Sequence, residues 1–273
     1  MQGLLESLAE HILRASSGNP VTLAFILSSI AALLTTAGAL LSIPVKPRER
    51  DSGGQTGSVI DVGLGFSSGV MIVASFTSLI LPAMDLAGFA RPAMGFLLGA
   101  FTIHAVNKLV PHEHLIKGYE GPRALAGKVR ASWLVAAAIL IHNLPEGMAI
   151  GSASVYSPER GVITGLAIAF QDIPEGLAVA LPVALIKGST LWGMVLGLLS
   201  GLSEVLLAVP TAALGSLIVW LLPYLLGFGA GAMVYVVSHE ALPESHRTGR
   251  EREATIGFFA GFMLMLYLDS TLG

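Results

Sequence analysis

The 273-residue chain contains no cysteine. Disulfide bonds, thiolate metal ligands and thiol nucleophiles are therefore excluded, and the redox state of the compartment cannot be read from the sequence. Charged residues are also scarce, at 12% of the chain, whereas a soluble domain carries roughly 25%. This deficit argues against a water-facing enzyme and indicates a membrane protein.

Apolar residues fill the chain instead, at 53%, and the mean hydropathy is +0.75. The 32 glycines and 14 prolines are tolerated in transmembrane helices, where neighbouring segments satisfy the freed backbone groups. The formal net charge of −3 is spread between apolar runs. No basic stripe is present, which excludes a nucleic-acid-binding protein.

Continuous apolar runs approach the roughly 20 residues that a helix needs to cross a bilayer, and none has the period-two pattern of a membrane barrel. The connections between them are short, and the longest is a polar stretch at about 112–130. We therefore expect one all-α polytopic membrane domain over residues 1–273. Its eight expected spans are about 21–43, 58–81, 92–111, 131–153, 160–185, 190–213, 216–239 and 254–272.

Lysine and arginine favour cytoplasmic loops and so predict the orientation. If the N-terminus lies outside, 12 of the 15 basic residues fall in or beside cytoplasmic loops, and only Arg14, Arg91 and Arg160 lie outside. Both termini are therefore expected to face away from the cytoplasm.

A doubled polar motif interrupts two neighbouring spans. The string HNLPEG at residues 142–147 lies in the fourth, and QDIPEG at residues 171–176 lies in the fifth, 29 residues later. At about 100° per residue, the first, second and fifth positions of each motif share one helix face. Because the turn between the spans is short, we expect antiparallel neighbours whose polar faces meet at the same depth.

Acidic residues inside a span cost roughly 2.5–3.5 kcal/mol each, which marks them as functional candidates. Imidazole with carboxylates suits zinc and its first-row neighbours, whereas a proton relay would not need the amides. A fourth buried acid, Glu204, lies in the sixth span. Together Glu146, Asp172, Glu175 and Glu204 would balance two divalent cations, although protonation of the acids would balance the charge equally well. An isolated residue of this kind is often a polar helix contact, but a doubled motif is not explained that way.

These motifs resemble the paired signature of the ZIP family of divalent-metal transporters. Residues 111–114 and 238–246 are similar to its prokaryotic GufA-type branch. The resemblance implies eight helices in a 3+2+3 inverted-repeat arrangement and a binuclear site between the fourth and fifth helices. It assigns Glu146 and Glu175 as bridging carboxylates, with further ligands divided between two metals. His142 and Gln171 would serve one metal, Asn143, Asp172 and Glu204 the other, and Met71 would be a thioether ligand.

The resemblance also implies a plasma-membrane protein, in bacteria of the inner membrane, that carries Zn²⁺ into the cytoplasm. Cd²⁺, Fe²⁺ and Mn²⁺ are plausible cargo too, and no resident cofactor is expected. A cytoplasmic exit relay would use residues at the end of the seventh span and in the loop after the third, although solvated helix-end residues would look the same. These residues are His112, Glu113, His114, His239, Glu240, Glu244 and His246.

An intramembrane zinc metalloprotease is the rival enzyme class, but its His-Glu-x-x-His string does not occur in the chain. A purely structural membrane protein would leave the buried acids unexplained. The sequence leaves open the rank order of the metals, proton coupling, assembly as a homodimer, and whether the metal-bearing helices slide as a block.

Overall fold

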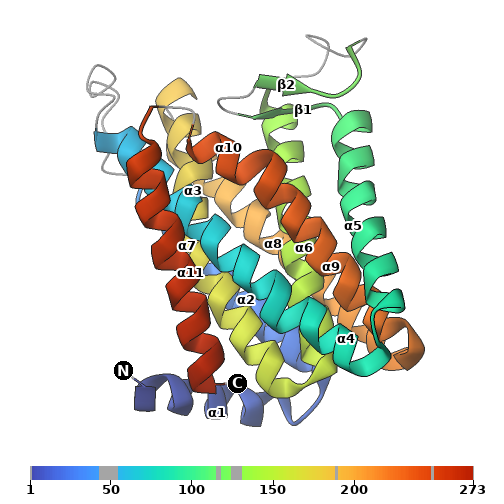
Figure 1. The fold of residues 1–273 in the computed structure, drawn as a ribbon. Coiled ribbons are helices and arrows are strands. Elements are labelled where there is room, and N and C mark those ends of the chain that lie inside the picture. The colour runs from blue at the N-terminus through green and yellow to red at the C-terminus, as the bar shows by residue number, and fades with distance from the viewer. Residues whose placement is uncertain are drawn as a thin grey trace.

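A computed structural model describes residues 2–42, 55–114, 118–123, 131–187, 190–246 and 249–272. Helices pack side by side over most of this length (Figure 1). Their bounds are α1 Gln2–Ser16, α2 Pro20–Leu40, α3 Gln55–Ala74, α4 Leu81–Ala87, α5 Ala90–Leu109, α6 Ala131–Tyr156, α7 Pro158–Lys187, α8 Thr190–Leu217, α9 Leu222–Val236, α10 Leu242–Ser245 and α11 Glu251–Leu272.

Six helical segments within the described residues are long and apolar enough to cross a membrane. This finding confirms a helical membrane protein. The helices α5, of 20 residues, and α6, of 26, lie where two further spans are expected, and the total of eight stays a prediction. The six segments are Pro20–Leu40, Ser58–Ala87, Pro158–Ala180, Leu191–Leu217, Val219–Ser245 and Glu251–Leu272.

Two of the long helices contain a π-helical segment. Ser75–Ile80 joins α3 to α4, and Val237–Ala241 joins α9 to α10. Each segment comes directly before a Leu-Pro pair, at Pro82 and at Pro243. Proline has no N–H and its ring crowds the preceding turn, so a locally widened helix accommodates it. Such π-type turns are common at functional sites, and the second one contains His239 and Glu240.

Close helix contacts define how the helices are grouped. The helices α2, α6, α7 and α8 pack against one another, while α3 pairs with α11 and α5 pairs with α9. In the α3–α11 pair, a Cβ added to Gly69 or Gly261 would lie 2.1 or 2.0 Å from a carbonyl oxygen of the facing helix. In the α5–α9 pair, a Cβ added to Gly99 or Gly231 would likewise lie against a carbonyl oxygen of the facing helix. Small residues thus let these backbones approach closely, as is typical inside membranes.

The two ends of the bundle carry different elements. The amphipathic helix α1, which the hydropathy of the sequence did not predict, lies across the end where α11 finishes (Figure 1). Its buried Ala9 and Ile12 belong to the core. At the opposite end, part of the polar connection after α5 forms an antiparallel hairpin of β1, His112–His114, and β2, Gly118–Glu120. We call these ends the terminal face and the hairpin face.

Candidate metal centre

The paired motifs lie on α6 and α7, which are antiparallel neighbours joined through Ser157. The Ser157 hydroxyl accepts a hydrogen bond from the Arg160 backbone N–H at 3.1 Å, which caps the start of α7. Because the connection is so short, the two antiparallel helices start from the same end of the bundle, and their midpoints lie at a similar depth in the membrane. Pro145 and Pro174 fall inside these helices without ending them.

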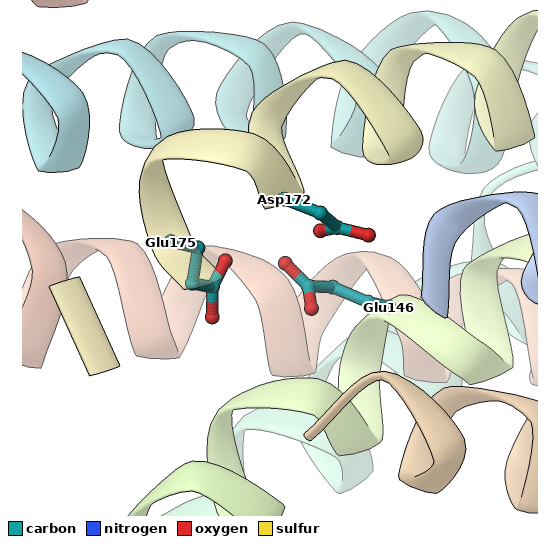
Figure 2. Close-up of side chains that lie close together, drawn as sticks. All are labelled: Glu146, Asp172 and Glu175. Carbon is teal, nitrogen blue, oxygen red and sulfur yellow. The ribbon is translucent and has the colours of Figure 1, made fainter. Parts of the chain in front are cut away.

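Three carboxylates converge between the two helices. Glu146 from α6 and Asp172 and Glu175 from α7 each offer one oxygen, and these oxygens lie within 4.8 Å of one another (Figure 2). The centre of an equilateral triangle with 4.8 Å sides is about 2.8 Å from its corners, whereas zinc–carboxylate distances are about 2.0–2.2 Å. Side-chain movements of less than about 1 Å would therefore bring all three oxygens to a transition-metal ion.

Two amide side chains each hold one carboxylate of this centre. Gln171 donates a hydrogen bond through Nε2 to Glu146 Oε1. Asn143 donates through Nδ2 to Glu204 Oε1 at 3.0 Å. Each amide uses its N–H on a carboxylate, and so its oxygen remains available to a cation.

Five buried oxygens of the centre have no hydrogen-bond partner in the described part of the chain. A buried polar atom without a partner costs roughly 1–3 kcal/mol, and native structures seldom leave such atoms together without a reason. Carboxylate and amide oxygens without hydrogen-bond donors are the ligands that a hard or borderline cation prefers. They are Asn143 Oδ1, Glu146 Oε2, Gln171 Oε1, Asp172 Oδ2 and Glu204 Oε2.

The fourth acid reaches the centre from a third helix. A Cβ built on Gly147 of α6 would lie 2.6 Å from the Glu204 carbonyl oxygen of α8. This close approach places Glu204, which is fully buried, against Asn143. The predicted grouping of Asn143 with Glu204 therefore has a direct contact in the fold.

His142 contacts a residue of the expected exit relay. Its Nε2 lies 3.0 Å from Glu240 Oε2, and the Glu240 side chain is only 1% exposed. Asn107 of α5 donates a hydrogen bond to the other oxygen of Glu240. His142 lies one helical turn before Glu146 on α6, so it links the carboxylate cluster to the π-helical segment on the hairpin side.

Met71, the expected thioether ligand, is buried on α3. It lies one helical turn after Ser67, whose hydroxyl donates to the Gln171 carbonyl oxygen of α7 at 3.1 Å. Residues four apart share a helix face, so Met71 lies on the face of α3 that meets α7.

The remaining exit candidates lie towards the hairpin face. His112 is buried and its Nδ1 lies 2.8 Å from the Val110 carbonyl oxygen. His239 is exposed beside Tyr235, at 5.1 Å between ring centroids, and Glu244 is half-buried. His246 Nδ1 lies 2.9 Å from both the Leu242 carbonyl oxygen and the Ser245 hydroxyl. Glu113 and His114 pair with β2 through their backbones, and their side chains lie outside the described part.

The two sides of the centre differ in accessibility. On the terminal side, Ala149 and Ile150 of α6 and Ile168 of α7 are fully buried. On the hairpin side, the His142 side chain is 24% exposed and Glu175 is half-buried. Around the centre, the side chains named on the hairpin side are therefore more exposed than those named on the terminal side.

Sequence reasoning missed several polar residues that the fold uses. Asp61 of α3 is buried and pairs with Arg250 at 2.8 Å. The rule that marked Glu204, an acid inside an apolar run, would also have marked Asp61. Asn107 and Ser200 carried no such signal, because an amide or a hydroxyl in a span is ordinary. Their role depends on which helix faces them.

Comparisons with known proteins agree with this picture. Residues 111–269 match the family model described as ZIP Zinc transporter. The chain is 40% identical to the zinc transporter GufA of Myxococcus xanthus, over 89% of this chain and 98% of that protein. It is 38% identical to the zinc transporter ZIPB of Bordetella bronchiseptica, over 78% and 72% of the two chains. It is also 30% identical to human ZIP11, over 88% and 94%. From its helical membrane architecture and these matches, the chain belongs to the ZIP zinc transporter family.

Proposed function

We propose that this protein moves divalent transition-metal cations, chiefly Zn²⁺, across a membrane through the centre between α6 and α7. The observation that carries the proposal is that three buried or half-buried carboxylates from two helices bring oxygens within 4.8 Å of one another, in motifs that also hold buried oxygens without hydrogen-bond partners in the described residues. Such an arrangement is unstable without a cation or bound protons, because like charges repel and the polar atoms are desolvated. The names of the relatives, all zinc transporters, support zinc as the principal cargo.

The ligand set suits two cations. We propose that Glu146 and Glu175 bridge them, that His142 and Gln171 bind one, and that Asn143, Asp172 and Glu204 bind the other. Met71 would supply a thioether ligand. Asn143 and Glu204 are in contact, and Gln171 bonds Glu146, which supports this division. Cd²⁺, Fe²⁺ and Mn²⁺ fit the same donors, since mixed nitrogen, oxygen and thioether ligands discriminate weakly among them.

We propose that the hairpin face is cytoplasmic and that transport runs inwards. Lysine and arginine dominate the connections on that side, as cytoplasmic loops require. The accessible His142 and its contact with Glu240 would then form the first step of the exit relay. The terminal face, with α1 and both termini, would lie outside the cytoplasm in a plasma or bacterial inner membrane, with residues 1–273 acting as one domain.

Transport further requires that the centre opens to the terminal face. We propose that α2, α6, α7 and α8 slide as one block against α3, α5, α9 and α11, because the closest contacts lie within these groups. Polar contacts that cross the boundary include Ser67 with Gln171, His142 with Glu240, and the ion pair of Arg160 with Asp269. Each of them would have to break for the blocks to move.

Purified protein in proteoliposomes tests the proposal. Initial uptake of Zn²⁺ should saturate, and competition by Cd²⁺, Fe²⁺ and Mn²⁺ would rank the metals. A peptide mixture incubated with the same protein should remain uncleaved, which separates a transporter from an intramembrane metalloprotease. Absence of Zn²⁺ flux from correctly folded protein would refute the proposal.

A further inference from the structure

We propose that Ser200 of α8 is a positioning residue for the metal centre. In this inference, which rests on the proposed function, Ser200 fixes the orientation of the Asn143 amide so that its oxygen faces the cations. Ser200 itself is fully buried and acts only through Asn143.

The Asn143 amide nitrogen has three hydrogen-bond acceptors around it. Nδ2 lies 3.0 Å from the Ser200 carbonyl oxygen, 3.0 Å from the Ser200 hydroxyl and 3.0 Å from Glu204 Oε1. An amide nitrogen has two hydrogens, so these three acceptors occupy its whole donor capacity. The amide oxygen Oδ1 is buried and has no partner in the described part of the chain.

The backbone carbonyl of residue 200 and Glu204 set which way the amide points, and the Ser200 hydroxyl holds it there by accepting a hydrogen bond from the same nitrogen. A carbonyl oxygen can only accept hydrogen bonds, so an amide flipped by 180° would place Oδ1 against it and repel it. Glu204 Oε1, which accepts from Nδ2, would likewise face the amide oxygen of a flipped side chain. The Ser203 hydroxyl also donates to the Ser200 carbonyl, at 2.6 Å. The oriented amide therefore presents an oxygen ligand to the centre and keeps its hydrogens away from a cation.

The same geometry explains why an amide side chain, rather than another carboxylate, occupies position 143. One end of the side chain must donate to Ser200 and Glu204, and the other must offer a lone pair to the metal. A carboxylate cannot donate at either end when ionised. The contacts with Ser200 and Glu204 therefore require asparagine at position 143, next to the cation that Glu204 also binds.

The test compares Ser200→Ala with Ser216→Ala, a control at an exposed serine on the same helix. The Ser216 hydroxyl donates to the Ala212 carbonyl and lies four turns from Ser200. Zn²⁺ titration of purified protein, followed by calorimetry, measures the Kd of each of two binding steps. Residues that orient a metal ligand typically change metal affinity by about 10- to 100-fold when removed.

Ser200→Ala removes the hydroxyl and keeps the backbone carbonyl, so we expect it to weaken one binding step by about tenfold, the low end of that range, and to leave the other within twofold. The KM for Zn²⁺ uptake should rise more than kcat falls. A merely structural role would instead lower stability and affect both steps equally. In the two-Cd²⁺ protein, only one of two ¹¹³Cd resonances should shift. Ser200→Cys, whose slightly larger thiol accepts hydrogen bonds only weakly, should give a smaller loss. It replaces the alanine variant in the test if that variant does not fold.

Three results would overturn the inference: unchanged Kd values in both Ser200 variants, equal weakening of both steps, or the same change in Ser216→Ala. If wild-type protein binds Zn²⁺ while Ser200→Ala behaves like wild type, the proposed function stands and only the role of Ser200 fails. If wild-type protein binds no Zn²⁺, the proposed function fails as well.

Discussion

Glu146→Gln is the most informative single change, because it removes one negative charge from the centre and nearly preserves the shape of the side chain. Glu146 lies on the α6 side of the carboxylate cluster and accepts the hydrogen bond of Gln171 through Oε1. Its Oε2 is buried and unpartnered in the described part. The variant keeps an acceptor for Gln171 and turns an N–H group towards the cations.

The size of the effect follows from the cluster geometry. A divalent cation about 2.8 Å from a carboxylate oxygen gains about 12 kcal/mol of attraction at an effective dielectric constant of 20. Reorganisation of the site and entry of water restore part of this when the charge is lost. Removing one partner of a buried charge pair costs about 3–5 kcal/mol, and the lower value weakens binding by about 100-fold. A bridging role would extend the loss to both cations.

The assay is a Zn²⁺ binding titration on purified protein together with initial uptake rates in proteoliposomes. Glu159→Gln is the matched control, since Glu159 is an exposed acid in the first turn of α7 and loses the same charge. We expect Glu146→Gln to lose high-affinity binding and most uptake, while Glu159→Gln matches wild type. A Glu146→Gln protein with normal abundance, a wild-type Kd and wild-type uptake would refute the assignment of the centre.

Further predictions address the cation count, the motion and the packing. Asn143→Lys places an ammonium group at one cation position, so elemental analysis should find one bound metal per protein instead of two, with reduced but measurable uptake; two retained metals, or none, would contradict separable positions. Arg160→Cys with Asp269→Cys, bridged by a thiol-specific crosslinker, should stop uptake until the link is cut; normal uptake by the bridged protein would argue against sliding blocks. Gly261→Ala puts a Cβ 2.0 Å from a carbonyl oxygen of α3 and should lower the melting temperature by about 5 °C or more. The control Gly3→Ala, which has open space, should leave it unchanged, and equal melting temperatures would show that the α3–α11 contact is not tight.

Helix positions and the polar faces of α6 and α7 were predictable because they depend on local properties of the chain. A bilayer requires continuous apolar segments whose backbone bonds are internal, so hydropathy marks the segments that cross it. A helical period of 3.6 residues then fixes which side chains share a face, and this was enough to place Glu146 opposite Asp172 and Glu175. Their roles as ligands remain predictions.

The partners of each polar atom were decided only by the tertiary structure. Periodicity assigns a face to a helix but does not say which helix covers that face. The close approach of α6 and α8 at Gly147 gives Asn143 its contacts with Ser200 and Glu204. The π-helical segment before Pro243 contains Glu240, which contacts His142 of α6. Whether an oxygen is left free for a cation depends on such contacts between residues tens of positions apart, and local sequence patterns carry no information about them.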